Sequence, residues 1–292
     1  VYRGDSVLEM SDKRVRALRG NEIAMIFQDP MTSLNPGYRV GTQIAESLRL
    51  HKGMSKKEAN KRAVELLDMV GIPHADKRAR DYPHQFSGGM RQRAMIAMAL
   101  ACDPDILIAD EPTTALDVTI QAQILDLMMD LQERTGTAII MITHDLGIVA
   151  DMSDRVLVMY AGKPAEYGTA DEVFYTPVHP YTWGLLDSLP RHDVDEKGIL
   201  EPIEGQPPSL ISVPTGCAFH PRCAYARDVC KTDVPELKSL ADGRLSSCHF
   251  SDDPDFLAQR EDASQRYVDP SATEAQAAGE PKDDADAGEE TS

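Results

Sequence analysis

The chain lacks an excess of basic residues, a long hydrophobic run and a signal peptide, and each absence excludes a class of protein. It carries 30 Lys and Arg against 48 Asp and Glu, a net charge of -18. This balance argues against the basic face that nucleic-acid binding requires, so no nucleic-acid partner is expected. Its acidity fits either a high-salt cytoplasm or ordinary solubility with a charged tail. No apolar run approaches the roughly 20 residues that span a bilayer, so a membrane role would need a partner subunit.

Apolar runs and helical periodicity predict an α/β fold. Residues 23–27, 106–109 and 139–142 are continuous apolar runs typical of buried strands. A helix is expected between the last two strands, over about 120–134. Because these strands are apolar on both faces, the order strand–helix–strand predicts a parallel sheet covered by helices.

The region from about 41 to 100 follows a helical pattern and is expected to form a helical subdomain. Ser55 is suited to cap a helix that closes at Gly71 and Pro73. Ser87 is expected to begin a second helix. We assign residues 1–165 to the α/β domain that contains this subdomain.

The composition changes after Tyr160, where prolines recur and four of the five cysteines fall within 32 positions. This pattern indicates a small, loop-rich second module over 166–250. Acidic and small residues dominate residues 251–292, which we expect to form a disordered tail.

Several polar residues stand where a strand ends or a helix begins. Asp110 and Glu111 follow a predicted strand, where one carboxylate can hold Mg²⁺ through water and the next can act as a base on an attacking water. Two such acids could equally cap the following helix. His144 ends the apolar run 138–143, and a lone histidine there is more often structural. Ser87-Gly88-Gly89 opens a helix whose amides and dipole favour an anion, although the same residues could form a plain N-cap.

Together, these motifs in this order resemble the nucleotide-binding subunits of ABC transporters. The resemblance implies a P-loop NTPase-like ABC ATPase core that uses ATP and Mg²⁺. It makes Asp110 the Walker B residue, Glu111 the catalytic base and His144 the switch histidine at the γ-phosphate. The remaining implied nucleotide-site residues are Gln28 of the Q-loop, Ser87, Gly88 and Gly89 of the signature motif, and Asp117 on the dimer seam.

Three longer strings, at 27–36, 82–86 and 113–119, look like the ATP-binding subunits of dipeptide and oligopeptide permeases. The resemblance runs from about Arg14 to Phe250. It implies a subunit that energises a peptide importer by ATP hydrolysis and dimer closure. The implied partners are a second ABC ATPase subunit in a heterodimer, two membrane permease subunits and, indirectly, an extracellular solute-binding protein. The implied location is the cytoplasmic face of the membrane, held there through the permease.

The phosphate loop of this family, G-x-x-x-x-G-K-[ST], does not occur in the sequence. Only 27 residues precede Gln28, whereas the family places the loop several dozen residues upstream. We therefore expect an N-terminally incomplete domain with uncovered apolar helix surface, active when intact and inactive as this chain alone. The alternatives are a non-catalytic remnant that acts as a binding or iron–sulfur module, and a soluble ABC ATPase. The latter would lack the 28–36 string and the cysteine extension.

The four clustered cysteines, Cys217, Cys223, Cys230 and Cys248, have the spacing C-x5-C-x6-C-x17-C. A cytoplasmic setting disfavours disulfides. Zinc sites usually contain close C-x2–4-C pairs, which are absent, although nearby histidines leave zinc as an alternative. Four thiolates suit a [4Fe–4S] cluster, and residues 216–223 closely resemble the C-terminal extension of peptide-permease ATPases, some of which carry one. Unligated thiols are the third alternative. Cys102 lies apart and is expected to be a buried core thiol.

Overall fold

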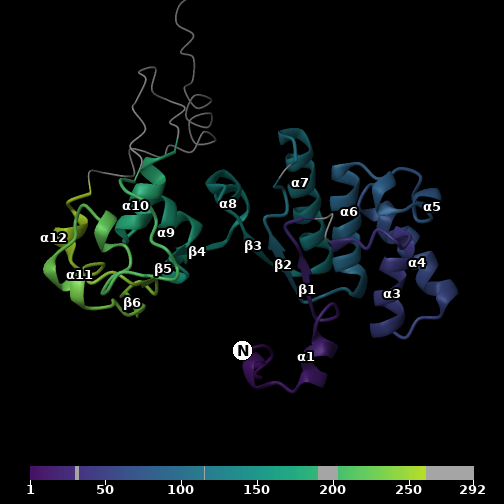
Figure 1. The fold of residues 1–292 in the computed structure, drawn as a ribbon, viewed down its shortest axis with the longest axis horizontal. Coiled ribbons are helices and arrows are strands. Elements are labelled where there is room, and N and C mark those ends of the chain that lie inside the picture. The colour runs from purple at the N-terminus through teal and green to yellow at the C-terminus, as the bar shows by residue number, and fades with distance from the viewer. Residues whose placement is uncertain (30–32, 115, 190–202, 261–292) are drawn as a thin grey trace, which may run out of the picture. The chain divides into compact units, whose positions relative to one another are not determined.

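The computed structural model describes residues 1–29, 33–114, 116–189 and 203–260. It divides into two compact units, Val1–Leu146 and Gly147–Ser292, and each is described by itself (Figure 1).

A three-stranded parallel sheet forms the centre of the first unit. Strands β1 (Ile23–Ile26), β2 (Ile106–Asp110) and β3 (Ala138–Ile142) lie in that order. The pairing is parallel throughout, as the sequence predicts. The carboxyl ends of β1, β2 and β3 therefore point the same way and bring the loops that follow them to one edge of the sheet.

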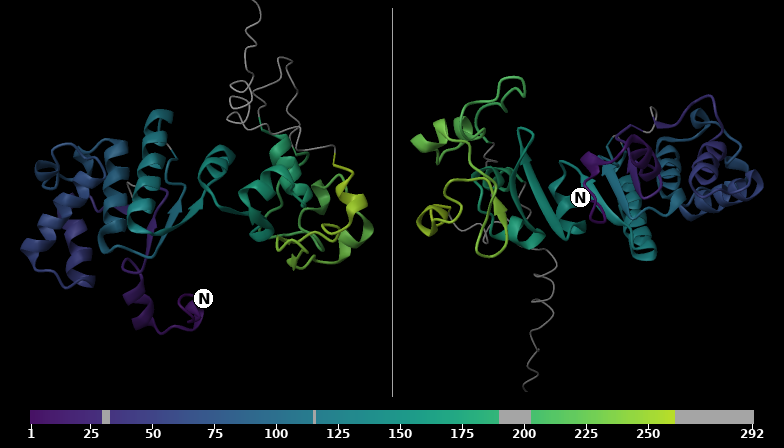
Figure 2. Two further views of the ribbon diagram at one scale, coloured as in Figure 1. Left: turned by 180° about the vertical axis from the view of Figure 1, so that it is seen from behind. Right: turned by 90° about the horizontal axis from the view of Figure 1, so that it is seen from below.

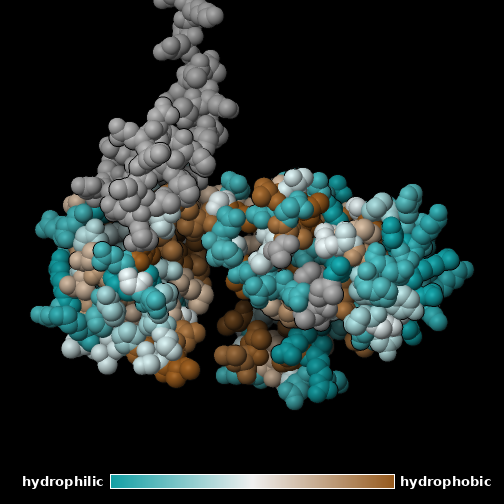
Figure 3. Space-filling model, turned by 45° about the horizontal axis from the view of Figure 1, so that its top comes forward, coloured by the Kyte–Doolittle hydropathy of each residue, from teal (hydrophilic) through white to brown (hydrophobic). Residues whose placement is uncertain are grey.

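Only one face of this sheet is buried within the first unit. Helices α6 (Gly88–Ala99) and α7 (Val118–Thr135) lie beside the strands in Figure 1, and Ala24, Leu107 and Ala109 are buried. The expectation that helices cover the whole sheet is wrong for the other face of the described unit. Four large apolar residues there are 37–52% exposed: Met25, Phe27, Ile140 and Ile142. This uncovered apolar surface lies on or next to strands, whereas the sequence predicts it on helices. In Figure 3, brown marks the hydrophobic residues on the face of the molecule that is drawn.

The helical subdomain consists of α3 (Val40–His51), α4 (Lys56–Met69) and α5 (Ala75–Arg78), which gather next to α6 (Figure 1). Ser55 caps α4 in a reciprocal capping box with Glu58, and Ser87 caps α6. Both predicted helix starts are confirmed. The apolar stripe of α4 is buried because its residues recur with the helical period.

The N-terminal segment contains the 3₁₀ turn η1 (Val7–Glu9) and helix α1 (Asp12–Leu18). Three ionic contacts tie it to the sheet, one of them between Arg3 and Glu22 at 3.8 Å. Arg3 pairs with Asp105, just before β2, at 2.7 Å, and Arg14 pairs with Glu22, just before β1, at 2.5 Å. Two further 3₁₀ turns flank α6, η2 (Pro83–Gln85) and η3 (Leu100–Cys102).

The second unit is built on a four-stranded antiparallel sheet in the order β4-β5-β7-β6, seen from two sides in Figure 2. Its strands are β4 (Arg155–Tyr160), β5 (Lys163–Thr169), β6 (Lys238–Ser239) and β7 (Leu245–Ser246). The helices are α8 (Leu146–Met152, which begins at the unit boundary), α9 (Ala170–Tyr175), α10 (Pro180–Asp187), η4 (His220–Arg222), α11 (Asp228–Thr232) and α12 (Pro254–Leu257).

Residues 251–260, expected to belong to the tail, pack on the second unit through α12. Phe256 is almost fully buried against Trp183 and Phe250, at ring-centroid distances of 5.4 and 5.3 Å. The rest of the predicted tail, residues 261–292, lies outside the described residues. No helix among the residues described has both the length and the apolar character to cross a membrane.

Candidate nucleotide site and cysteine cavity

The Glu111 carboxylate is at the centre of a cluster of polar side chains at the carboxyl edge of the parallel sheet. Gln28 donates from Nε2 to Glu111 Oε2 at 2.7 Å, and Thr114 donates from Oγ1 to the same oxygen at 2.9 Å. His144 Nδ1 lies 3.0 Å from Oε1. Three segments that are far apart in sequence thus meet at one carboxylate, because β1, β2 and β3 end side by side.

The backbone and side chain of Glu111 are both held in an unusual state. Its φ of +43° lies in the left-handed region, which non-glycine residues rarely adopt and which clusters at functional sites. Its amide donates to the carbonyl of Ile142 at 2.9 Å. Hydrogen bonds from Thr114, then His144 and Gln28, lower the pKa of Glu111. The carboxylate is therefore kept ionised, as a base must be.

Asp110 is the last residue of β2 and is partly buried. It therefore directly precedes the Glu111 cluster. Neither Asp110 nor Glu111 caps the following helix, α7. The N-cap residue of α7 is Asp117, whose Oδ1 accepts from the Ile120 amide at 2.9 Å.

The N-termini of α6 and α7 lie against each other. A Cβ on Gly89 would be 2.9 Å from Cγ2 of Ile120 in the first turn of α7, whereas one on Gly88 would meet only Leu116 Cδ2, at 4.0 Å. Ser87 Oγ accepts from the Met90 amide at 3.3 Å. Two positive helix ends therefore sit together, an arrangement that favours an anion. This helix contact gives Gly89 a packing role that the sequence alone does not show.

The sequence did not single out Thr114 or Gln92 as site residues. Gln92 is buried and donates from Nε2 to the carbonyl of Pro112 at 2.5 Å. It thus joins α6 to the loop that carries Glu111. Thr114 could have been found from its spacing, since a hydroxyl three residues beyond an acid in a turn lies within reach of it. Gln92 had no such signal, because its partner is a backbone carbonyl 20 residues away.

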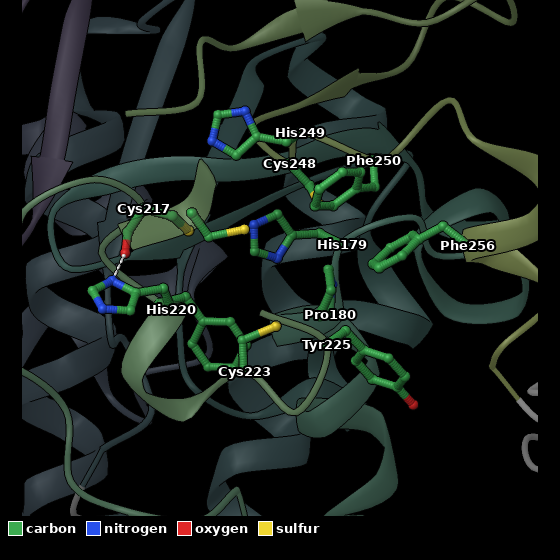
Figure 4. Close-up of a pocket in the computed structure, with 12 residues that line it drawn as sticks. His179, Pro180, Cys217, His220, Cys223, Tyr225, Cys248, His249, Phe250 and Phe256 are labelled. Atoms are coloured by element: carbon green, nitrogen blue, oxygen red, sulfur yellow. Dashed lines mark hydrogen bonds between the residues drawn. The ribbon is translucent and has the colours of Figure 1, made fainter. Parts of the chain in front are cut away.

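The four clustered cysteines line one cavity in the second unit, together with His179, Pro180, Phe219, His220, Tyr225, His249, Phe250 and Phe256 (Figure 4). The structure thus brings together all four residues singled out in the sequence. Burial raises the pKa of Cys223 to about 12 and that of Cys248 to about 11. None of the five cysteines forms a disulfide.

Local backbone contacts shape this cavity. Cys217 donates its amide to the Cys230 carbonyl at 2.9 Å. A Cβ on Gly216 would lie 2.3 Å from that carbonyl oxygen, and its φ is +69°, so only glycine fits. Hydrogen bonds from backbone groups two residues ahead lower the thiol pKa values of Cys217, Cys223 and Cys248, against the larger effect of burial.

Cys102 lies apart in the first unit. Its side chain is fully buried, and Sγ lies 3.7 Å from the Ser47 carbonyl. The predicted core thiol is confirmed.

Two protein-family models match the chain. The ABC transporter model matches residues 2–114, and the model of the oligopeptide/dipeptide transporter C-terminal region matches residues 165–230.

Curated relatives match most of the chain. The oligopeptide transport ATP-binding protein OppD of Salmonella typhimurium is 56% identical over 247 residues, 85% of this chain and 73% of the relative. The dipeptide transport ATP-binding protein DppD of Bacillus subtilis is 54% identical over 252 residues, 86% of this chain and 75% of the relative.

The fold has counterparts among solved structures. A dimeric post-hydrolysis state of the ATP-binding cassette MJ0796, bound to ADP and Pi, superposes with a TM-score of 0.50 at 30% identity, over 56% of this chain and 68% of that one. With this α/β fold, the Glu111 cluster and relatives above 50% identity, the chain belongs to the ATP-binding proteins of the oligopeptide and dipeptide ABC transporter family.

Proposed function

We propose that this chain is the ATP-binding subunit that energises an importer of dipeptides or oligopeptides. The observation that carries the proposal is the convergence of Gln28, Thr114 and His144 on Glu111. Glu111 would take the proton of the attacking water, Asp110 would hold Mg²⁺, and His144 would contact the γ-phosphate. Gln28 would sense the bound Mg²⁺ and couple the nucleotide site to the membrane subunits. The peptide substrate follows from the names of the relatives.

Ser87, Gly88 and Gly89, with Asp117, serve the nucleotide of an opposing ATPase subunit. Their place at two adjoining helix N-termini supports this role, because the ends of α6 and α7 favour phosphate. The working assembly is a heterodimer of ATPase subunits on the cytoplasmic face of the membrane, bound to two permease subunits. An extracellular solute-binding protein delivers the peptide to that permease.

Two substitutions test the catalytic roles in a chimera that joins a phosphate-loop segment of an ABC ATPase to this chain. Glu111→Gln removes the base and keeps the Mg²⁺ site, so ATP should still bind while kcat falls by about 10²-fold or more. Asp110→Asn should instead weaken the binding of Mg²⁺–ATP. Hydrolysis and nucleotide binding are measured separately. Glu111→Gln turnover within a few-fold of the parent chimera would contradict the assignment.

We further propose that Cys217, Cys223, Cys230 and Cys248 bind one [4Fe–4S] cluster that fixes the loops of the second unit. Four thiols on one cavity with apolar walls match the thiolate ligands that such clusters take. Backbone hydrogen bonds to three of the sulfurs would stabilise their thiolate forms.

The cavity histidines leave zinc as the alternative to the cluster, because a metal-ligating histidine commonly bonds a backbone carbonyl through its other ring nitrogen. His220 Nδ1 lies 2.9 Å from the Cys217 carbonyl, and His249 Nε2 lies 3.0 Å from the Asp233 carbonyl. Both rings thus have one nitrogen engaged by backbone. Among the described residues, no three His, Cys, Asp or Glu side chains form a group that could hold a metal ion, so the proposal rests on the cavity that the four thiols share.

The metal content of anaerobically purified protein tests this proposal. Iron and acid-labile sulfide should each reach about four per chain. Replacing any one of the four cysteines by serine should lower that content, whereas Cys102→Ser should not. One equivalent of zinc in colourless protein would assign the site to zinc, and protein without metal would leave the thiols unligated.

A further inference from the structure

Two of the four clustered cysteines are held next to each other by their own backbones. The Cys217 amide donates to the Cys230 carbonyl at 2.9 Å, and Thr215 Oγ1 donates to the Lys231 carbonyl at 3.0 Å. Between these two hydrogen bonds, Gly216 approaches so closely that a Cβ there would lie 2.3 Å from the Cys230 carbonyl oxygen. The two segments are therefore in direct contact at the positions of the two thiols.

Bond geometry limits the distance between the Cα atoms of Cys217 and Cys230. Their hydrogen bond of 2.9 Å, extended at both ends by standard backbone bonds, allows a separation of at most about 6.8 Å when all the atoms lie on one line. Hydrogen-bonded residue pairs in antiparallel sheets are about 5.5 Å apart, and disulfides join Cα atoms about 4.4–6.8 Å apart. Both side chains line the cysteine cavity, so both thiols face the same space (Figure 4). The pair therefore meets the distance requirement of a disulfide.

The other two thiols of the cavity lack such a backbone link. Among the described residues, no backbone hydrogen bond joins Cys223 or Cys248 to another of the four cysteines. The linked pair is also asymmetric, because Cys217 is half-buried whereas Cys230 is only 8% exposed. A small reagent in solution therefore reaches the Cys217 thiol before the Cys230 thiol.

We propose that Cys217 and Cys230 are a redox-active dithiol, which closes a reversible disulfide when the cavity holds no metal and a low-molecular-weight disulfide is present. The proposal does not require the [4Fe–4S] cluster, since the chain itself holds the two backbones together. The disulfide closes a ring over residues 217–230 and leaves Cys223 and Cys248 as the remaining thiols of the cavity. A centre with four thiolate ligands and this disulfide therefore exclude each other.

The reaction is a thiol–disulfide exchange in two steps. The Cys217 thiolate attacks one sulfur of the small disulfide, which forms a mixed disulfide and releases one small thiol. The Cys230 thiolate then attacks the Cys217 sulfur and expels the second small thiol. The two protein thiols are oxidised, the small disulfide is reduced to two thiols, and the two protons lost by the cysteines end on those thiols.

Oxidation of the full 292-residue chain by 2-hydroxyethyl disulfide tests the proposal. The protein is first treated with a chelator and a reductant and then freed of both. Because burial raises the pKa of the Cys217 thiol, the exchange is run at about pH 9 to supply thiolate. The count of free thiols should fall from five to three, with the loss of two hydrogen atoms in the protein mass. Unreduced proteolytic peptides should contain a Cys217–Cys230 cross-link, and a reductant should restore all the thiols.

Oxidation in denaturant is the control for the folded geometry. In the unfolded chain, pairing favours the shorter loops that join Cys223 to Cys217 or to Cys230, so the Cys217–Cys230 cross-link should no longer dominate. Cys223→Ser is the matched variant from the same cavity and should still fall from four free thiols to two. Cys217→Ser should form no internal disulfide. The peptide map of the wild-type chain decides the pairing even if a variant fails to fold.

Three results would overturn the proposal. The first is a folded wild-type chain that keeps all five thiols. The second is a mixed disulfide that persists on Cys217, because Cys230 would then be out of reach. The third is a cross-link that mainly joins any other pair, such as Cys223 and Cys248. Each of these leaves the metal content of the protein a separate question, since the chain is oxidised without metal.

Discussion

At the scale of single residues, the hydrogen bond from Thr114 has the largest effect on the pKa of Glu111. The lowered pKa keeps the carboxylate ionised as pH falls through the usual carboxyl range, so base catalysis persists there. Removing this donor should raise the pKa of Glu111 toward its ordinary value. The base would then be lost at a higher pH.

Thr114→Val in the phosphate-loop chimera should therefore move the acidic limb of the pH–kcat profile to higher pH. At pH 8 the carboxylate is ionised in either case, so kcat there should stay within about twofold. Thr119→Val, at an exposed threonine on α7, is the matched control and should leave the profile in place. An unmoved acidic limb in Thr114→Val would show that this hydroxyl does not tune the base.

At the scale of elements, the sequence predicts most of what local rules govern. The capping serine of α4, its buried stripe and the parallel order of β1, β2 and β3 all follow from periodicity and capping. The uncovered sheet face could not be predicted, because apolar alternation shows which residues suit burial and not whether a covering element is present. The contacts of Gln92 and Gly89 could not be predicted either, because they join separate elements.

The contact between α6 and α7 predicts opposite outcomes for two adjacent glycines. Gly89→Ala would push a methyl group into Ile120 and should lower the free energy of unfolding of the first unit by about 1–3 kcal/mol. The methyl group of Gly88→Ala meets only Leu116 Cδ2, at an ordinary contact distance of 4.0 Å, so this substitution should be neutral or slightly stabilising, since alanine favours helix by up to about 1 kcal/mol over glycine. Denaturant unfolding measures both.

A double variant supplies the control for this contact. Ile120→Ala removes the side chain that an added methyl would strike, so Gly89→Ala should cost less in that background. An unchanged cost would place the strain elsewhere than at the α6–α7 contact. Activity is a separate readout, because either alanine would also hold a phosphate away from the signature backbone.

At the scale of the whole molecule, the 292-residue sequence contains the proposed base, Mg²⁺ ligand and signature residues of an ABC ATPase, and the motif G-x-x-x-x-G-K-[ST] does not occur in it. The loop's amides and lysine make the main contacts to the β- and γ-phosphates in P-loop enzymes. In the 292-residue chain taken alone, the Glu111 cluster would thus face a nucleotide whose β- and γ-phosphates lack these contacts.

We therefore predict that the 292-residue chain binds ATP weakly and hydrolyses it negligibly, although it is folded and Glu111 is in place. The assay measures ATP binding and phosphate release by the chain alone and by the phosphate-loop chimera at equal concentration. The chimera should gain turnover that Glu111→Gln abolishes, which ties the recovered activity to this chain's own base. Turnover by the unmodified chain near that of the chimera would contradict the prediction, because the polar cluster at the sheet edge would then suffice without a phosphate cradle.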